Sequence, residues 1–231
     1  MADKMSGYII PKQGIILVNK PRGITSHDVV DIVRNRLSMR KVGHTGTLDP
    51  IAEGLLIILV GKATKLFNRF ANFDKEYLGV LKLGEITTTG DSEGKVTKKA
   101  GYTKITQSNI RDVFSRFEGE IEQVPPMVSA IRIGGKRLYS LARRGIAIER
   151  APRRIVIKSL QLRSIDLPHV EFYAYCSKGT YIRKLAEDIG EVLGCGAHMI
   201  SIKRLSIGAF KLDEAVDLDN VNESHLRKVT F

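Results

Sequence analysis

The longest uninterrupted aliphatic run in the chain, from Leu55 to Val60, is the feature that most constrains its fold. An aliphatic run of this length without a polar residue is typical of a strand that is buried on both faces. It is far shorter than the roughly 18–20 apolar residues that a membrane-spanning helix needs. We therefore expect a strand inside a covered sheet, and no membrane partner.

Two later segments, 155–165 and 170–175, alternate apolar and polar residues across a turn, which predicts an antiparallel pair of strands. Further strands are expected at 14–19, 77–83, 127–133 and 197–210. Helices are expected at 26–37, 63–73, 108–117, 137–144 and 180–193, with Ser26 and Thr180 as caps, and loops at 41–53 and 87–94. Because strands and helices mix without regular alternation, the expected fold class is α+β, with one domain around a mainly antiparallel sheet.

Charge is concentrated in one part of the chain. The chain has 37 Lys and Arg residues against 25 Asp and Glu, a formal net charge of +12. The segment Arg132–Arg163 holds ten basic residues and the single acidic residue Glu149, so it alone carries +9. We interpret this segment as a basic arm that projects from the folded body to lie on phosphates. The alternative interpretation is a solvated charged surface without a partner.

Several kinds of chemistry lack their motifs. No G-x-x-x-x-G-K-[ST] loop, G-x-G-x-x-G turn or G-x-S-x-G elbow occurs. Cys195 and His198 lack the second pair that a zinc site needs. Two cysteines cannot build a disulfide framework, and no hydrophobic leader is visible, so we expect a reducing, cytoplasmic setting. The sequence predicts no cofactor and no metal, and chemistry done by carboxylate, arginine and tyrosine side chains.

The segment Gly43–Pro50, with the sequence GHTGTLDP, is the densest patch of unusual residues. Its two glycines let the backbone turn tightly, and Pro50 restricts Asp49 to extended conformations. Asp49 is therefore a carboxylate on a constrained loop directly before the buried strand, and a candidate catalytic residue. The alternative is a turn aspartate that bonds its own backbone.

This loop resembles the catalytic loop of pseudouridine synthases of the TruB type. Other segments are similar to motifs of that family, in family order over about residues 14–210: GIILVNKPRG at 14–23, DKEY at 74–77, PPMVSA at 125–130, GKRLY at 135–139, KGTYIR at 178–183 and GCGAH at 194–198. The resemblance implies the pseudouridine synthase fold, a mixed and mostly antiparallel sheet with the active cleft at its centre. It also implies a single catalytic domain over residues 1–231, with a thumb insertion at about 125–152.

By this resemblance the protein isomerises uridine to pseudouridine at position 55 in the T loop of tRNA, without a cofactor. Asp49 then has the role of the carboxylate nucleophile, and the sequence leaves open whether it attacks the ribose, attacks the base or acts as a base at the ribose. Arg183 keeps it ionised, and Tyr77 stacks on the flipped-out base. Without the resemblance, Arg183 reads as a surface arginine and Tyr77 as a core aromatic residue. The resemblance assigns substrate-binding roles to His44, Lys20, Lys65, Tyr181, Ile202, Arg137, Arg143 and Arg144.

Two departures from the family pattern stand out. Many bacterial members carry a small C-terminal RNA-binding (PUA) domain, whereas only 21 residues with several acidic side chains follow Phe210 here, so no such domain is expected. Ile202 stands where the family usually has Leu, a conservative change.

Three alternative functions stay open. The first is an RNA-binding module or tRNA-folding factor, and the second is a relative that depends on a guide RNA and partner proteins. The third is a glycosidase, which would need Glu53 or Asp74 near Asp49. We expect a monomer that binds the T-stem loop of tRNA and requires no protein partner.

Overall fold

A long mixed sheet forms the body of the molecule. A computed structural model describes residues 13–129, 131–142 and 144–230, and within them the sheet has ten strands. Its main path runs β14-β1-β3-β12-β4-β11-β10-β7, with β2 paired to β3 and β13 to β12. Neighbours are antiparallel except for the β1–β14 and β3–β12 pairs, so the expected mixed, mostly antiparallel sheet is confirmed. The strands are β1 Gly14–Lys20, β2 Val42–His44, β3 Ala52–Val60, β4 Lys75–Leu83, β7 Gly119–Gln123, β10 Arg153–Asp166, β11 His169–Cys176, β12 Ala197–Ile207, β13 Phe210–Lys211 and β14 Val216–Asp217.

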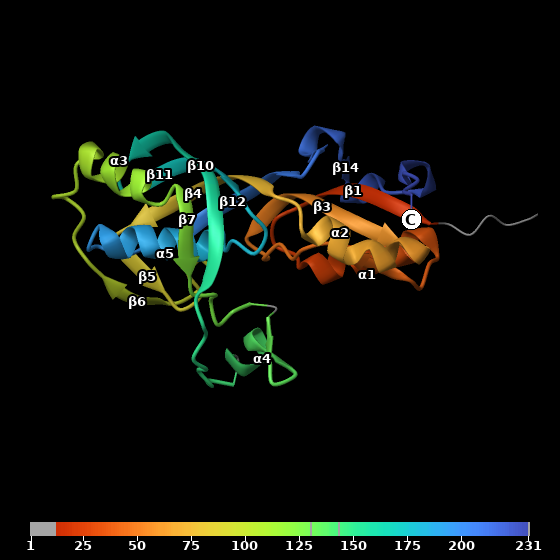
Figure 1. The fold of residues 1–231 in the computed structure, drawn as a ribbon, viewed down its shortest axis with the longest axis horizontal. Helices are drawn as coiled ribbons and strands as arrows, with labels where there is room; N and C mark the ends of the chain where they lie inside the picture. The colour runs from red at the N-terminus through yellow and green to blue at the C-terminus, as the bar shows by residue number, and fades with distance from the viewer. Residues whose placement is uncertain (1–12, 130, 143, 231) are drawn as a thin grey trace, which may run out of the picture.

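Strand β3 is buried on both faces, as its aliphatic run predicts. Leu56, Ile58 and Val60 pack with α1 Ser26–Leu37 in one apolar cluster. Leu55, Ile57 and Leu59 point the other way and pack near Phe70 of α2 Phe67–Ala71. Figure 1 shows α1 and α2 beside β1 and β3 in the same half of the molecule.

The other half of the sheet is covered by α3 Gln107–Arg116 and α5 Ile182–Val192 (Figure 1). Leu185 and Ile189 of α5 and Phe114 of α3 share one apolar cluster with Phe172 of β11. The centre of the sheet, where β3, β12 and β4 meet, lies between these two packed halves and receives loops from both.

Two helix caps differ from the expectation. Thr25, not Ser26, caps α1: its hydroxyl accepts from the Asp28 backbone N–H, and the Asp28 carboxylate accepts from Thr25 in return. Tyr181 precedes the first residue of α5, and its side chain makes no cap bond. The Thr180 hydroxyl instead donates to the Ser177 carbonyl at 3.0 Å. The two hydroxyls expected to cap these helices, those of Ser26 and Thr180, therefore bond to loop backbone instead: Ser26 to Leu48 and Thr180 to Ser177.

One expected helix is replaced by two shorter elements, and one expected loop is confirmed apart from its first residue, Thr87. The helix expected at 63–73 is a 3₁₀ turn, η1 Gly61–Leu66, followed by the short α2. The loop expected at 87–94 lies between β5 Glu85–Thr87 and β6 Val96–Lys99, which form a separate two-stranded sheet. No described helix is long and apolar enough to cross a membrane.

The thumb-like segment projects from one side of the sheet (Figure 1). The strand expected at 127–133 is wrong apart from its last two residues, which form β8 Arg132–Ile133 and pair with β9 Lys136–Arg137. The short helix α4 Leu138–Ala142 follows. The basic run does not project throughout, because its second part, from Arg153, lies in β10 of the main sheet.

Residues 212–230 are part of the body. They contain the 3₁₀ turns η2 Leu212–Glu214, η3 Leu218–Asn220 and η4 Glu223–His225, and strand β14. Strand β14 pairs in parallel with β1, and Leu218 and Val221 are buried against the α1 side of the sheet. Gly14 permits this packing, since a Cβ there would lie 2.2 Å from the Arg227 carbonyl oxygen.

Candidate active site

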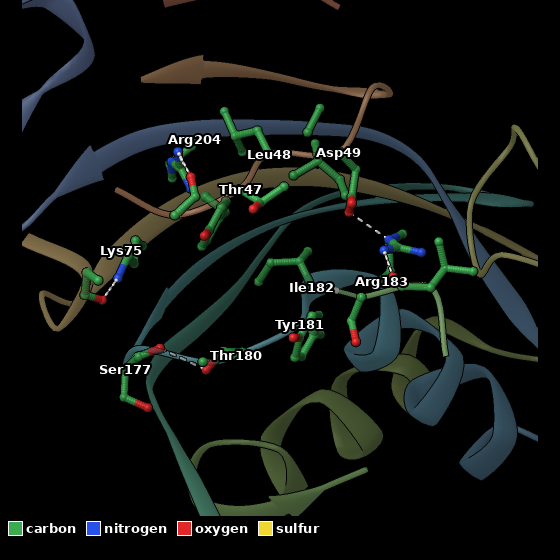
Figure 2. A pocket seen from close by; sticks show the side chains of 18 residues that line it. Thr47, Leu48, Asp49, Lys75, Ser177, Thr180, Tyr181, Ile182, Arg183 and Arg204 are labelled. Carbon is green, nitrogen blue, oxygen red and sulfur yellow. Dashed lines mark hydrogen bonds and ion pairs between the residues drawn. The ribbon is translucent and has the colours of Figure 1, made fainter. Parts of the chain in front are cut away.

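A cavity of about 240 Å³ lies at the centre of the sheet. Its walls come from the loop before β3 and the first residue of that strand, the end of α2, strands β4 and β12, the start of α5 with its preceding loop, and the root of the thumb. Figure 2 shows Asp49 and Arg183 pointing toward one another on one side of this cavity, with Lys75, Ser177 and Thr180 on the other. The residues that the resemblance singles out for catalysis, Asp49, Tyr77 and Arg183, all line it.

The loop that carries Asp49 is fixed on both sides of the carboxylate. The buried Ser26 hydroxyl accepts from the Leu48 N–H at 2.8 Å and donates to the Leu48 carbonyl at 2.9 Å. The Pro50 carbonyl accepts from the Gly23 N–H at 2.8 Å, and the Asp49 carbonyl accepts from the Ala52 N–H at 3.0 Å. The backbone is therefore held in place while the Asp49 side chain stays 35 % exposed to the cavity.

Arg183 is buried behind the carboxylate and uses each of its three nitrogens. Nε donates to Asp49 Oδ2 at 2.8 Å, as Figure 2 shows. Nη1 donates to the Thr89 carbonyl at 2.6 Å and Nη2 to the Val128 carbonyl at 2.8 Å. A planar guanidinium held at three points orients the Asp49 carboxylate and places a fixed positive charge next to it.

A second carboxylate, which the sequence analysis did not single out, also faces this arginine. Asp91 Oδ2 lies 3.6 Å from Arg183 Nε, and its side chain is only 4 % exposed. Its other oxygen accepts from the Glu93 N–H at 3.1 Å and from the Thr89 hydroxyl. The Thr- and Gly-rich loop around Asp91 was visible in the sequence, but its contact with α5 had no local signal.

Aromatic and aliphatic side chains make the apolar part of the cavity. Tyr77 of β4, Tyr181 before α5 and Ile202 of β12 all line it, and Tyr77 and Ile202 are buried. Burial raises the pKa of the Tyr77 phenol and that of the Tyr181 phenol, so both stay protonated near neutral pH. The site thus places neutral rings beside the Asp49–Arg183 ion pair.

Two buried basic side chains of the cavity wall, Arg204 and Lys75, were not predicted from the sequence as site residues. Arg204 of β12 donates from Nε to the Leu55 carbonyl at 2.7 Å and from Nη2 to the Gly46 carbonyl at 3.2 Å. Its place could have been inferred from Ile202, because residues two apart on a strand share a face. Lys75 Nζ donates to the Ala71 carbonyl at 2.7 Å, and burial lowers its pKa to about 8.

Gly54 allows β3 and β12 to come together at this point. Its φ is +101°, and a Cβ there would lie 2.4 Å from the Arg204 carbonyl oxygen. Only glycine fits both the backbone angle and the close approach. The parallel contact of these strands brings Ile202 opposite Ala52 at the edge of the cavity.

Lys20, His44 and Lys65, three further predicted substrate-binding residues, do not line the cavity. Lys20 is fully buried, where Nζ donates to the Ala52 carbonyl at 2.6 Å and to the Pro21 carbonyl at 2.9 Å, and burial lowers its pKa to about 8. His44 lies in β2 opposite Ile58, and Lys65 is exposed on η1.

Of the three arginines predicted to contact tRNA from the thumb, the structure describes two. Arg144 is exposed on the thumb and Arg137 lies in β9. Arg143 lies outside the described residues.

The acids that a glycosidase would need lie elsewhere. Glu53 pairs with Lys203 at 3.5 Å, and Asp74 pairs with Lys158 at 2.6 Å. Asp49 is the one carboxylate among the described residues that line the cavity. In residues 13–129, 131–142 and 144–230, no group of three or more His, Cys, Asp and Glu side chains is placed to hold a metal ion.

Two family models together match most of the chain. One, described as TruB family pseudouridylate synthase (N terminal domain), matches residues 34–182. The other, described as tRNA pseudouridylate synthase B C-terminal domain, matches residues 183–229. In the structure this second segment supplies α5, β12 and β14, so it completes the same sheet rather than forming a body of its own.

Curated relatives agree with these models. A tRNA pseudouridine synthase B from Clostridium tetani is 47 % identical over 215 residues, which cover 93 % of this chain and 74 % of the relative. A tRNA pseudouridine synthase B from Clostridium kluyveri is 49 % identical with the same coverage. One from Opitutus terrae is 43 % identical over 94 % of this chain and 90 % of its own length.

Solved structures are also similar to this chain, at lower sequence identity than the curated relatives. A chain in the crystal structure of a Cbf5-Nop10-Gar1 complex matches with a TM-score of 0.71 and 30 % identity over 90 % of this chain. A chain in the structure of an H/ACA RNP bound to a substrate RNA containing 2′-deoxyuridine matches with a TM-score of 0.66 and 29 % identity, also over 90 %. The match spans about half of those chains, 53 % and 51 %.

Proposed function

The chain belongs to the TruB family of pseudouridylate synthases, isomerases that convert uridine to pseudouridine in tRNA, and on that premise we propose that its target is the uridine at position 55 in the T loop. The observation that carries the proposal is the 2.8 Å ion pair between Asp49 and Arg183 at the wall of the central cavity. An RNA-binding module would have no need of a carboxylate oriented so tightly among groups meant for phosphates.

In the proposed reaction, the Asp49 carboxylate forms a bond to C1′ of the ribose as the bond between C1′ and N1 of uracil breaks, and the base keeps the electron pair of the broken bond. The freed base turns within the cavity, and its C5 forms a bond to C1′ as the bond between Asp49 and C1′ breaks. The hydrogen on C5 leaves and N1 gains one, so the product has the same atoms as the substrate. Arg183 keeps the Asp49 carboxylate oriented, since Nε donates to it while Nη1 and Nη2 are bound to the backbone carbonyls of Thr89 and Val128.

The cavity suits a base that has left its stack. Enzymes that act on a base inside folded RNA flip it into a pocket and hold it by stacking and edge contacts. Tyr77 supplies a neutral ring for this purpose, and Tyr181 and Ile202 supply the remaining apolar wall. While the base is detached, these walls keep it next to the ribose it must rejoin.

Binding of the tRNA body is assigned to groups outside the cavity. Arg137, Arg143 and Arg144 of the thumb and Lys65 of η1 would contact phosphates of the T-stem loop, giving affinity rather than base choice. His44 and Lys20 support the loop side of the site. We further propose that the protein works as a cytoplasmic monomer without a protein partner, which the presence of its own thumb supports.

The test uses the protein alone. It is incubated with an unmodified tRNA transcript, and pseudouridine is mapped by carbodiimide labelling and primer extension, with the molecular mass followed by light scattering. A single stop at the T-loop uridine is the expected result. Bound tRNA without any stop would contradict the proposal and favour a tRNA-folding factor or a partner-dependent enzyme.

A further inference from the structure

The side chain of Gln123 forms a two-point clamp on the backbone of Tyr181. Gln123 is the last residue of β7 and is only 2 % exposed. Its Oε1 accepts from the Tyr181 N–H at 2.8 Å, and its Nε2 donates to the Tyr181 carbonyl at 3.1 Å. Both halves of a buried amide are thus bound to a single residue of the cavity wall, as in a rung between two strands.

The clamp joins the root of the thumb to the start of α5. The thumb begins two residues after Gln123, while Tyr181 stands two residues before Arg183. In the thumb segment, the Val128 carbonyl accepts from Arg183 Nη2 at 2.8 Å, and the next carbonyl, that of Ser129, accepts from the Tyr139 N–H of helix α4 at 3.0 Å. The route from α4 to the catalytic arginine is therefore short and hydrogen-bonded.

An apolar side chain could fill the space of Gln123 but could not fix a peptide group. The orientation of the Tyr181 peptide decides where the Tyr181 ring and the Arg183 guanidinium stand, because both follow directly along the chain. The Tyr181 carbonyl also accepts from the Leu185 N–H at 3.0 Å, so it is the Tyr181 N–H that would need another partner in a buried place without Gln123. A buried amide at this position thus has a geometric consequence at the cavity.

We propose that Gln123 is a positioning residue that links the placement of the thumb to the Asp49–Arg183 pair. With the thumb seated on tRNA, β7 and the Val128 segment are fixed, and the clamp holds Tyr181 and Arg183 in register with Asp49. This inference rests on the proposed function, since it needs a thumb that closes on tRNA and a reaction at Asp49. It predicts that losing the clamp impairs the chemical step more than binding.

The test is the variant Gln123→Leu with a tRNA transcript, measuring the single-turnover rate at saturating protein and the Kd for tRNA separately. We expect the rate to fall about 10- to 100-fold, the size expected of a misplaced catalytic group, and the Kd to stay within about threefold. Gln161→Leu is the matched control, because Gln161 is an exposed strand residue of β10 whose side chain donates to the Ser159 hydroxyl, away from the cavity. It should leave both quantities unchanged.

The outcomes separate the two proposals. A wild-type protein that makes pseudouridine, with a Gln123→Leu variant of normal rate or with only a weaker Kd, overturns the positioning role alone. A wild-type protein that makes none overturns the proposed function and this inference with it. If Gln123→Leu does not fold, Gln123→Glu decides by the same two measurements, because it keeps the shape but replaces the donor to the Tyr181 carbonyl with a repelling oxygen. A normal rate in that variant again overturns the inference.

Discussion

The loop that carries Asp49 and the thumb both leave the sheet, yet they are held in different ways. The Asp49 loop is bonded to the body by Ser26, Gly23 and Ala52 within a few residues. The thumb is stabilised within itself, by bonds such as Leu138 N–H to the Ile131 carbonyl, and meets the site through Val128. We propose on this basis a division of labour, in which the loop fixes the proposed reacting group and the thumb adapts to the RNA.

The largest loss of activity is expected when the proposed reacting group of the Asp49 loop is removed. Asp49→Asn keeps the size and the backbone bonds but removes the nucleophilic charge. Pseudouridine formation should fall by about 10³-fold or more, while the Kd for tRNA stays within about threefold. Carbodiimide mapping and filter binding measure the two quantities. Asp166→Asn, at the exposed end of β10, is the control, and full activity of Asp49→Asn would refute the proposed nucleophile.

The next largest effect is expected at the group that links the two regions. Arg183→Lys keeps a positive charge but cannot reach Asp49, Thr89 and Val128 at once. The single-turnover rate should fall about 100-fold, with a smaller change in tRNA affinity. Arg163→Lys, at a site where the arginine lies over the Tyr173 ring, serves as control. A wild-type rate in Arg183→Lys would show that charge alone suffices.

How far sequence predicts this site depends on whether the signal is local. Strands β10 and β11 follow from a period of two over 155–165 and 170–175. The cap at Thr25 rather than Ser26 could not be decided locally, because both are hydroxyl residues and the distant Leu48 backbone claims Ser26. Likewise, Asp91 reaches Arg183 only through the tertiary fold.

The thumb shows why a pattern of apolar residues can mislead. Met127 and Val128 have strand-like composition, but no sheet partner lies beside them. Val128 instead lines the cavity and offers its carbonyl to Arg183. Propensity measures how well a residue fits a pleated, half-buried surface, so it fails where the burial is supplied by a site rather than by a sheet.

A stability measurement tests the anchoring of the Asp49 loop. Ser26→Ala removes the hydroxyl that serves both the N–H and the carbonyl of Leu48 in a buried place. The free energy of unfolding should fall by about 1–3 kcal/mol, measured by denaturant titration. Ser115→Ala, at an exposed position on α3, should change it far less. An unchanged stability in Ser26→Ala would mean that the loop is held by its remaining bonds alone.

The smallest effect is expected at an exposed charged side chain of the thumb, whose proposed contact is with a tRNA phosphate. Arg144 is exposed on the thumb, so Arg144→Ala should leave the single-turnover rate at saturation unchanged and raise the Kd for tRNA only about 3- to 10-fold. If its contact is with a phosphate, the slope of log Kd against log salt should also decrease by nearly one, because one fewer counterion is released. Arg111→Ala, at an exposed position on α3, should change neither the Kd nor the slope. A lowered rate at saturation in Arg144→Ala would place the thumb in the chemistry itself, and the division between a fixed loop and an adapting thumb would no longer hold.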